Sequence, residues 1–250
     1  MLRTQYRLPD PCATVVSHFM YDGQVVSAAS VLSRNYSNNI ILKQFPELGA
    51  CNMAWYTYGE FGESKEKSEH SKYNLIEVDI TIHLVQQLET LNWDPKSICI
   101  IAMYERQTAI LKQRFSQLGG FFNNLNVLTV DASQGKEFSV VILNWVRSNK
   151  GHNLGFLRCK RRMNVSISRQ KNYLLLVGHL PTLYGSKLPD FLQLIGLQHN
   201  QQIRVKEFSY STTNCQIEPH NSYNPIAQYL QSHGMQIKEA LDHLSRPAAV

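Results

Sequence analysis

The sequence predicts an α/β fold in which a mostly parallel β-sheet is flanked by helices. Apolar runs rich in β-branched residues, each too short for a helix, predict buried strands at residues 98–102, 127–130, 140–145 and 173–177. Segments with a helical pattern of apolar residues precede and separate these runs. Because strands and helices alternate along the chain, we expect the strands to lie parallel.

Three segments carry the helical pattern. In residues 74–91, apolar side chains recur every three or four positions and would share one helix face. Residues 105–118 repeat the pattern, and the following pair, Gly119 and Gly120, is suited to end a helix. A third helix is expected around residues 162–170.

The strand pattern fades after about residue 184, which divides the chain into two parts. Residues 1–185 are expected to form one α/β domain, and residues 186–250 a helical or partly ordered tail. Within the tail, residues 188–197 and 224–244 have helical patterns, and the second of these opens with an Asn-Pro pair suited to a helix start.

Composition limits the class of protein. The 250 residues are 43% hydrophobic, enough for one sizeable core, and the formal net charge of +6 suits a polyanionic partner. The five cysteines form no Cys-x-x-Cys pair, so we expect reduced thiols and no metal site. Without a long apolar run or a signal-peptide layout, the chain is expected to be intracellular, in cytoplasm or nucleus, with no membrane partner.

Residues with chemical potential fall into three blocks, of which Gln5, Tyr6 and Arg7 form the first. A tyrosine beside an arginine offers a stacking face for a purine and a cation for phosphate oxygens. A core tyrosine next to a solvated arginine would give the same sequence, so both interpretations stay open at this point.

The second block, residues 129–137, lies between two predicted strands. Ligands of parallel sheets gather at the carboxyl ends of strands, and Gly135 would let the backbone approach a phosphate or ribose closely. Glu137 offers a carboxylate that can accept hydrogen bonds from ribose hydroxyls. The alternative is an ordinary turn with an exposed carboxylate.

The third block, residues 155–171, is rich in basic side chains. The cluster between Arg158 and Arg162 is typical of a solvated cationic face. Arg169, near the end of a predicted helix, is a candidate for an arginine that offsets charge on a transferred phosphoryl group.

No phosphate-binding loop accompanies these blocks. The sequence contains neither Gly-x-x-x-x-Gly-Lys-Ser/Thr nor a Gly-x-Gly-x-x-Gly that follows a strand. We therefore expect the chain to complete a nucleotide site from one side, since it cannot cradle a triphosphate alone.

In their order along the chain, the blocks resemble the motifs of the second RecA-like lobe of superfamily 1 helicases of the up-frameshift and senataxin type. The resemblance covers roughly residues 3–182. The matching segments are Gln5-Tyr6-Arg7-Leu8, Phe19-Met20-Tyr21-Asp22-Gly23, Asn74-Leu75-Ile76-Glu77, Ser97 to Gln107, Thr129 to Glu137, Val140-Val141-Ile142-Leu143, Val146-Arg147-Ser148-Asn149, Gly155-Phe156-Leu157, Arg161-Arg162-Met163-Asn164-Val165 and Ser168-Arg169. The resemblance implies a RecA-like parallel sheet of the P-loop NTPase superfamily that lacks its own phosphate loop.

The same resemblance implies roles for the nucleotide residues. Tyr6 would stack on the adenine, Gln5 would belong to the same cofactor site, and Glu137 would meet the ribose. Arg7 and Arg169 would be catalytic, because they would contact the γ-phosphate of an ATP held by a first lobe. The implied cofactor is ATP with Mg²⁺, the metal being held mainly by that first lobe.

The resemblance also implies a nucleic-acid track. Thr129 would contact the backbone of a strand, and Met103 with Tyr104 would line the same groove. Gln134 and Gly135 would couple this groove to the ATP cleft. The implied partners are the first lobe and single-stranded nucleic acid, with RNA favoured over DNA, and the implied activity is translocation and unwinding driven by ATP hydrolysis.

This sequence departs from the family pattern at several positions. Ala102 and Met103 replace a Thr-Pro pair, which removes a hydroxyl expected at the strand. Ser133 stands where an aromatic residue is usual, and Ser139 where an aspartate is usual. Both the strand contact and the coupling are therefore expected to be weaker.

Two other functional classes are compatible with these residues. One is a non-catalytic, helicase-derived module that binds RNA or protein, which would also lack a phosphate loop. The other is an unrelated nucleotide-dependent enzyme, which the missing glycines disfavour. The isolated chain is expected to be inactive as an ATPase.

Overall fold

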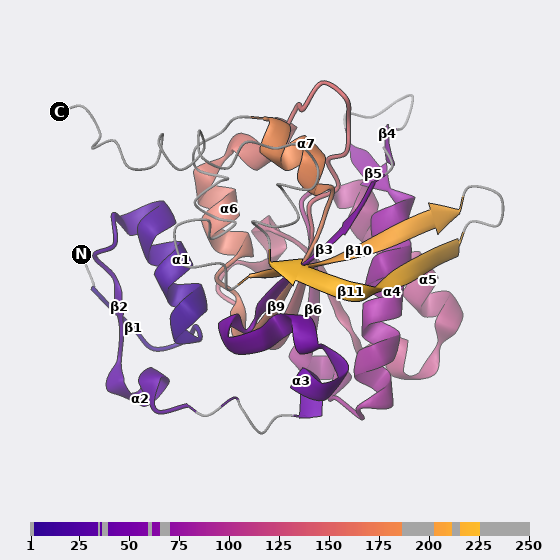
Figure 1. The fold of residues 1–250 in the computed structure, drawn as a ribbon. Coiled ribbons are helices and arrows are strands. Elements are labelled where there is room, and N and C mark those ends of the chain that lie inside the picture. Colours follow the sequence, from indigo (N-terminus) through magenta and orange to yellow (C-terminus); the bar gives the residue numbers. More distant parts are fainter. Residues whose placement is uncertain are drawn as a thin grey trace.

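In the computed structural model, the described residues are 3–34, 36, 40–59, 62–65, 71–186, 203–211 and 216–225. Most of them fold around a seven-stranded sheet with the strand order β11-β10-β3-β9-β8-β6-β7 (Figure 1). Its strands are β3 (Met53–Tyr58), β6 (Ile98–Ala102), β7 (Asn126–Thr129), β8 (Phe138–Asn144), β9 (Gln170–Val177), β10 (Arg204–Ser211) and β11 (Gln216–Pro225).

Neighbouring strands of this sheet are parallel, except that the edge strand β11 runs antiparallel to β10. Side chains of adjacent strand residues point to opposite faces, so each face needs its own cover of apolar residues. In β8, for example, Val141 packs in the core on one face, whereas Ile142 packs in the core on the other.

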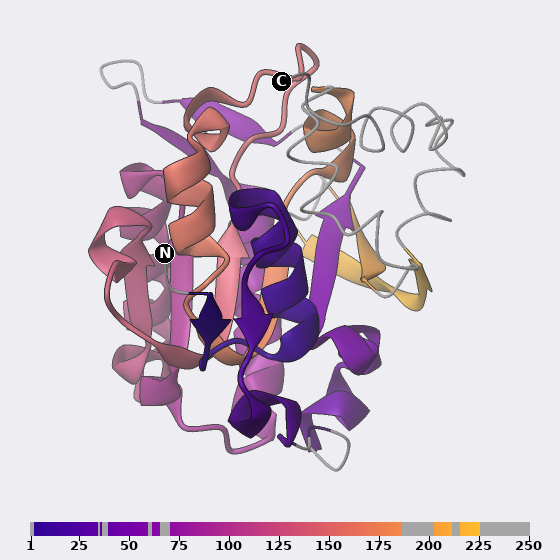
Figure 2. The ribbon, with the colours of Figure 1, turned by 90° about the vertical axis from the view of Figure 1, so that its left-hand side faces the viewer.

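Helices cover both faces of the sheet (Figures 1 and 2). One face carries α1 (Asp10–Tyr21), α6 (Lys160–Ser166) and α7 (Leu180–Gly185). The other face carries α3 (Ile40–Gln44), α4 (Leu75–Thr90) and α5 (Glu105–Leu118). Among the described helices, none has both the length and the apolar character needed to cross a membrane.

Smaller elements complete the described part of the fold. Strand β1 pairs in parallel with β2, and β4 pairs antiparallel with β5. These elements are β1 (Thr4–Gln5), β2 (Val26–Ser27), β4 (Glu63–Lys65), β5 (Lys72–Asn74), helix α2 (Ala29–Leu32) and the 3₁₀ helices η1 (Pro46–Cys51), η2 (Pro95–Ser97), η3 (Gly120–Asn124), η4 (Asp131–Ser133) and η5 (Gly155–Arg158).

The predicted α/β fold with a mostly parallel sheet is confirmed. Each of the four predicted strands corresponds to an observed one, β6 with identical bounds and β7, β8 and β9 with ends shifted by a few residues. Helix α4 begins after Asn74, whose side chain accepts a hydrogen bond from the Glu77 amide. Helix α5 ends at Leu118 and is followed by Gly119, which has a φ of 69°.

Other expectations differ from the structure. The helix expected at residues 162–170 ends at Ser166, because Gln170 already pairs with Phe138 as the first residue of β9. Strand β3 was not predicted. Its sequence, Met-Ala-Trp-Tyr-Thr-Tyr, has no aliphatic run, although all six of its residues are buried in the sheet.

The expected division of the chain at residue 185 also needs correction. Residues 204–211 form β10, which pairs in register with β3, so a segment assigned to the tail belongs to the main sheet. Residues 216–225 form the edge strand β11, which includes the Asn-Pro pair expected to start a helix. The predicted helix at 188–197 and the remainder of the one at 224–244 lie outside the described residues.

A buried polar network ties α4 to the carboxyl edge of the sheet. The carboxylate of Glu77, which is fully buried, accepts hydrogen bonds from the Tyr58 hydroxyl at 3.0 Å and from the Val146 amide at 2.8 Å. Asn74 donates from its side chain to the same hydroxyl at 2.6 Å and to the Val146 carbonyl at 3.2 Å. These bonds hold Val146 at a φ of 71°, a conformation that is costly for a β-branched residue.

We expect Glu77→Ala to lower the free energy of unfolding by about 2–4 kcal/mol, because the variant leaves the Tyr58 hydroxyl and the Val146 amide buried without their acceptor. Urea denaturation monitored by circular dichroism measures the change. Glu77→Gln keeps one acceptor oxygen, so its free energy of unfolding should fall by less. A loss for Glu77→Ala below about 0.5 kcal/mol, as is usual at surface positions, would contradict the structural role of the network.

Candidate nucleotide-binding site

Two residues of the candidate site are brought together by strand register. Strands β8 and β9 are parallel neighbours, and Phe138 of one pairs with Gln170 of the other. Glu137 and Arg169 immediately precede these two residues, so they lie side by side at the amino edge of the sheet. The Phe138 amide donates to the Arg169 carbonyl at 3.0 Å, which fixes the alignment.

Gln5 folds the N-terminal segment into a turn beside this edge. Its side-chain oxygen accepts hydrogen bonds from the Arg7 amide at 2.9 Å and the Leu8 amide at 2.8 Å. Its side-chain nitrogen donates to the Leu8 carbonyl at 3.0 Å and to the Ser27 hydroxyl at 2.7 Å. These bonds use the full capacity of an amide side chain, so Gln5 shapes the turn that presents Tyr6 and Arg7.

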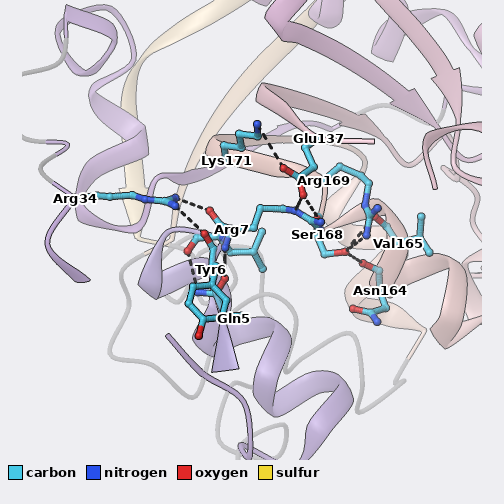
Figure 3. Close-up of polar contacts among 11 residues, drawn as sticks. Gln5, Tyr6, Arg7, Arg34, Glu137, Asn164, Val165, Ser168, Arg169 and Lys171 are labelled. Carbon is cyan, nitrogen blue, oxygen red and sulfur yellow. Dashed lines mark hydrogen bonds and ion pairs between the residues drawn. The ribbon is translucent and has the colours of Figure 1, made fainter. Parts of the chain in front are cut away.

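Arg7 connects the turn to the sheet edge (Figure 3). Its Nε donates to the Glu137 carboxylate at 2.6 Å, its Nη2 contacts the same carboxylate, and its Nη1 donates to the Ser168 carbonyl at 3.0 Å. Lys171 lies 3.4 Å from the other carboxylate oxygen of Glu137. The Arg7 hydrogen bond, assisted by Lys171, holds the pKa of Glu137 below its ordinary value.

Arg169 is oriented by residues at and just after the end of helix α6. Its Nε donates to the Val165 carbonyl at 3.0 Å, and its Nη2 donates to the Ser168 hydroxyl at 2.9 Å. Burial, together with the nearby charge of Arg7, lowers the pKa of the Arg169 guanidinium, which still remains cationic at neutral pH. A partly desolvated and oriented guanidinium is well suited to bind an oxyanion.

These residues line a cavity of about 670 Å³. Four of its lining side chains are cationic and one is anionic, and Tyr6 is 67% exposed at its edge. The lining residues are Thr4, Gln5, Tyr6, Arg7, Leu8, Ala13, Val16, Tyr21, Val25, Arg34, Glu137, Asn164, Ser168, Arg169 and Lys171. Five residues predicted for the ATP site from separate sequence blocks therefore meet in one pocket.

The pocket contains two cations to which sequence analysis assigned no role. Arg34 donates to the Tyr6 carbonyl and to the Arg7 carbonyl, both at 2.7 Å, and so braces the turn from its outer side (Figure 3). No sequence signal marks Arg34, an isolated arginine that lies outside the three blocks. Lys171 belongs to the third block, and only its contact with Glu137 reveals its part in the pocket.

The pocket lies at the amino edge of the sheet, whereas sequence reasoning expected ligands at the carboxyl ends of the strands. Thr129 ends β7 at the carboxyl edge, whereas Glu137 precedes β8 at the opposite, amino edge. Residues 129–137 thus span the height of the sheet. Gln134 and Gly135 lie within this crossing and are exposed, but neither lines the pocket, and Gly135 is needed for its φ of 80°.

The residues expected to contact nucleic acid differ in their exposure to solvent. Thr129 is partly exposed, and its hydroxyl accepts a hydrogen bond from the Ala132 amide at 3.2 Å. Met103 is only 7% exposed and Tyr104 only 4% exposed, because both pack in the core on the face covered by α1 and α6. Their side chains therefore do not form the expected groove wall in this conformation.

We expect the Arg7–Glu137 pair to make a pH-dependent contribution to stability. Because the pKa of Glu137 is lowered in the folded state, the contribution is present above the ordinary value of 4.5 and is lost as the pH falls through the folded pKa. Glu137→Gln should reduce the free energy of unfolding at neutral pH by less than about 1 kcal/mol, since the pair is partly exposed. Urea denaturation across this pH range tests it, and a difference that persists undiminished at low pH would contradict the assignment.

Comparison with known proteins identifies the family. The AAA domain family matches residues 1–181. DNA polymerase alpha-associated DNA helicase A of Saccharomyces cerevisiae is 32% identical over 73% of this chain and 28% of its own length. Probable helicase MAGATAMA 3 of Arabidopsis thaliana is 30% identical over 83% of this chain and 25% of its own length. ATP-dependent helicase NAM7 of S. cerevisiae is 30% identical over 76% of this chain and 20% of its own length.

This chain thus spans between 20% and 28% of the length of these relatives. The C-terminal domain of a possible DNA helicase from Lactobacillus plantarum has a TM-score of 0.45 at 12% identity, over 76% of this chain and 94% of that one, a likeness too distant to add to the assignment. The chain belongs to the AAA domain family, and its relatives place it among superfamily 1 helicases of the up-frameshift and senataxin type.

Proposed function

We propose that this chain is the C-terminal RecA-like lobe of an ATP-dependent superfamily 1 helicase, and that it completes the nucleotide site of a two-lobed motor. The observation that carries the proposal is the pocket at the amino edge of the sheet. It joins Tyr6, Arg7, Glu137 and Arg169 from three separate sequence segments. This chain spans only about a quarter of the length of these three relatives. We therefore assign the ATP-driven activity to the complete two-lobed protein.

The charge of the pocket supports a polyphosphate ligand. Arg7, Arg34, Arg169 and Lys171 contribute four cations, against the single carboxylate of Glu137. Since the sequence has no phosphate-binding loop, these cations would contact a triphosphate held by the other lobe. ATP would carry Mg²⁺, and its protein ligands would come mainly from that lobe, because a phosphate-binding loop supplies the Ser or Thr that binds the metal and this sequence contains no such loop.

Each pocket residue has a separate part in the proposed site. The exposed Tyr6 ring would stack on adenine, and Glu137 would accept hydrogen bonds from the ribose. Arg7 would leave Glu137 to reach the γ-phosphate, while Lys171 would keep the carboxylate from remaining unpaired. Arg169 would offset the charge that develops on the equatorial oxygens of the γ-phosphate during its transfer.

The proposed substrate is single-stranded nucleic acid, gripped through its backbone while ATP binding closes the two lobes. Relatives include a protein named as a regulator of nonsense transcripts and another named as a 5'-3' DNA helicase. We favour RNA, with DNA as the alternative. Residues 129–137 form a continuous segment of the chain that connects the carboxyl edge of the sheet to the ATP pocket. Such a motor would act inside the cell, in cytoplasm or nucleus.

In the two-lobed protein, we expect Arg169→Ala to lower the rate of ATP hydrolysis by ~10³-fold or more, because it removes the guanidinium that offsets transition-state charge. Steady-state ATP turnover with and without single-stranded RNA measures the loss. Arg114→Ala is the matched control: Arg114 lies on α5, outside the pocket, and contacts Asp79 at 3.8 Å.

Three results would count against separate parts of this proposal. Turnover by Arg169→Ala at the rate of Arg114→Ala would remove Arg169 from the catalytic step. Hydrolysis by the isolated chain would show that the phosphate grip does not require the other lobe. If the intact two-lobed protein turned over no ATP, the non-catalytic binding module would replace the motor.

We also expect Tyr6→Ala to weaken adenine nucleotide binding to the two-lobed protein by roughly tenfold, since stacking of a base on an aromatic ring contributes about 1–3 kcal/mol. Tyr6→Phe keeps the ring and should bind nearly as well as the unchanged protein. Titration with a fluorescent ATP analogue gives the dissociation constants. Equal binding by Tyr6→Ala and Tyr6→Phe would exclude the stacking role.

A further inference from the structure

An exposed aromatic ring lies at the carboxyl edge of the sheet, away from the ATP pocket. Phe156, in the 3₁₀ helix η5, is 49% exposed. It does not line the ATP pocket, and the core on which it rests does not enclose it. An aromatic side chain held half out of the core is a ready contact surface for a flat ligand.

Phe156 is held in place from below by Tyr104. The two ring centroids are 5.2 Å apart with an interplanar angle of 31°, and the Phe156 amide donates to the Tyr104 hydroxyl at 3.4 Å. Arg147 also donates to that hydroxyl, at 3.3 Å. Tyr104 is buried, so its position is fixed by the core, and it acts as the support for the ring that solvent reaches.

Gly155 is required for this arrangement. Its φ is 52°, and a Cβ at this position would lie 2.7 Å from the Tyr104 hydroxyl and 2.6 Å from Nη1 of Arg147. Any larger residue would push Phe156 away from its support. The close approach of the backbone therefore fixes where the exposed ring sits.

A guanidinium lies over the Phe156 ring and adds a second planar group to it. The Arg162 guanidinium carbon lies 5.3 Å from the Phe156 ring centroid. The Asp131 carboxylate holds this group by accepting two hydrogen bonds, one from Nε at 3.2 Å and one from Nη2 at 2.9 Å. Strands β6 and β7 pair Ala102 with Thr129, so Tyr104, which supports the ring, and Asp131, which holds the guanidinium, both follow strand ends at this edge.

Basic side chains neighbour this ring and guanidinium in the sequence. Arg158, Lys160 and Arg161 are all exposed and lie directly between Phe156 and Arg162 in the sequence. The carboxylate of Asp131 is already engaged by Arg162. The surface therefore combines two planar groups with an excess of positive charge, which is complementary to the phosphates and bases of a single strand.

We propose that Phe156 and Arg162 form a base-stacking platform for single-stranded nucleic acid, with Arg158, Lys160 and Arg161 contacting the adjacent phosphates. This inference rests on the proposed function, because it assigns a specific contact site to the nucleic acid that the motor would grip. It replaces Met103 and Tyr104, whose side chains are buried, by the exposed ring that Tyr104 supports. Thr129 lies two residues before Asp131, so the platform adjoins the residue expected to contact the strand.

The platform suggests how the two edges of the sheet communicate. Helix α6 carries Lys160, Arg161 and Arg162 at its start and ends at Ser166, two residues before Ser168, which lines the ATP pocket together with Arg169. A strand bound by Arg162 would therefore pull on the same helix that orients Arg169 through the Val165 carbonyl.

The test is fluorescence anisotropy of the 250-residue chain with a fluorescein-labelled oligouridylate of about 12 nucleotides. We expect Phe156→Ala to weaken binding by about 5- to 100-fold, because stacking is lost, whereas Phe156→Tyr keeps a ring and should bind within about twofold. Arg162→Lys, which keeps the charge and loses the planar group, should also weaken binding. Leu118→Ala is the control, since Leu118 is 46% exposed at the far end of α5.

The phosphate contacts have their own readout. The triple variant Arg158→Gln, Lys160→Gln and Arg161→Gln should flatten the dependence of log affinity on log salt by up to about 2, because each phosphate contact to a single strand contributes roughly 0.7 to the slope. Phe156→Ala should leave this slope unchanged, since it removes stacking and no charge. An unaltered slope in the triple variant would overturn the phosphate contacts.

The outcomes separate this inference from the proposed function. If the unchanged chain binds the oligonucleotide and Phe156→Ala binds it equally well, the platform is wrong and the nucleic-acid function stands; a protein ligand would then be the better occupant. If the unchanged chain is folded by circular dichroism yet binds no oligonucleotide, nucleic-acid binding by this lobe is wrong as well. The platform is supported if Phe156→Ala and Arg162→Lys bind the oligonucleotide more weakly while Leu118→Ala binds it as tightly as the unchanged chain.

Discussion

The parallel register between β8 and β9 is the constraint on which the candidate ATP site depends. Pairing of Phe138 with Gln170 leaves the residue before each strand at the same edge of the sheet, and these residues are Glu137 and Arg169. A slip of one position would turn every side chain of β9 to the opposite face and separate the pair. The rigid core of the sheet therefore sets the spacing of groups that would meet the sugar and the phosphates.

The second half of the site comes from a turn at the start of the chain. Gln5 uses its whole amide to hold that turn, and the turn presents Arg7 to the Glu137 carboxylate. Arg34 adds a clamp from outside the motif. Charge explains why the site needs this bracing. Four cationic side chains share the pocket with one carboxylate, and an anionic ligand would relieve the repulsion among them.

Opposite edges of the same sheet carry the two proposed activities. The carboxyl edge holds Phe156 and Arg162, and the amino edge holds Arg7 and Arg169. Helix α6 and residues 129–137 both run from one edge to the other. Ser133, where an aromatic residue was expected, is buried and donates its hydroxyl to the Val130 carbonyl at 2.7 Å, so the crossing segment is locally closed. In the proposed motor, residues 129–137 would couple the binding of nucleic acid at one edge to the binding and hydrolysis of ATP at the other.

The sequence by itself determined the fold class, the strands β6 to β9, helices α4 and α5, and the order of the motifs, because these follow from local periodicity, turn residues and fixed spacing. Tertiary structure decided the rest. Strand β10 joins the sheet through pairing with distant β3, and Arg34 reaches the pocket from a loop without any motif. Tyr104 is buried while Phe156 is exposed because packing on the sheet decides which ring solvent reaches, and packing depends on contacts between residues far apart in the chain.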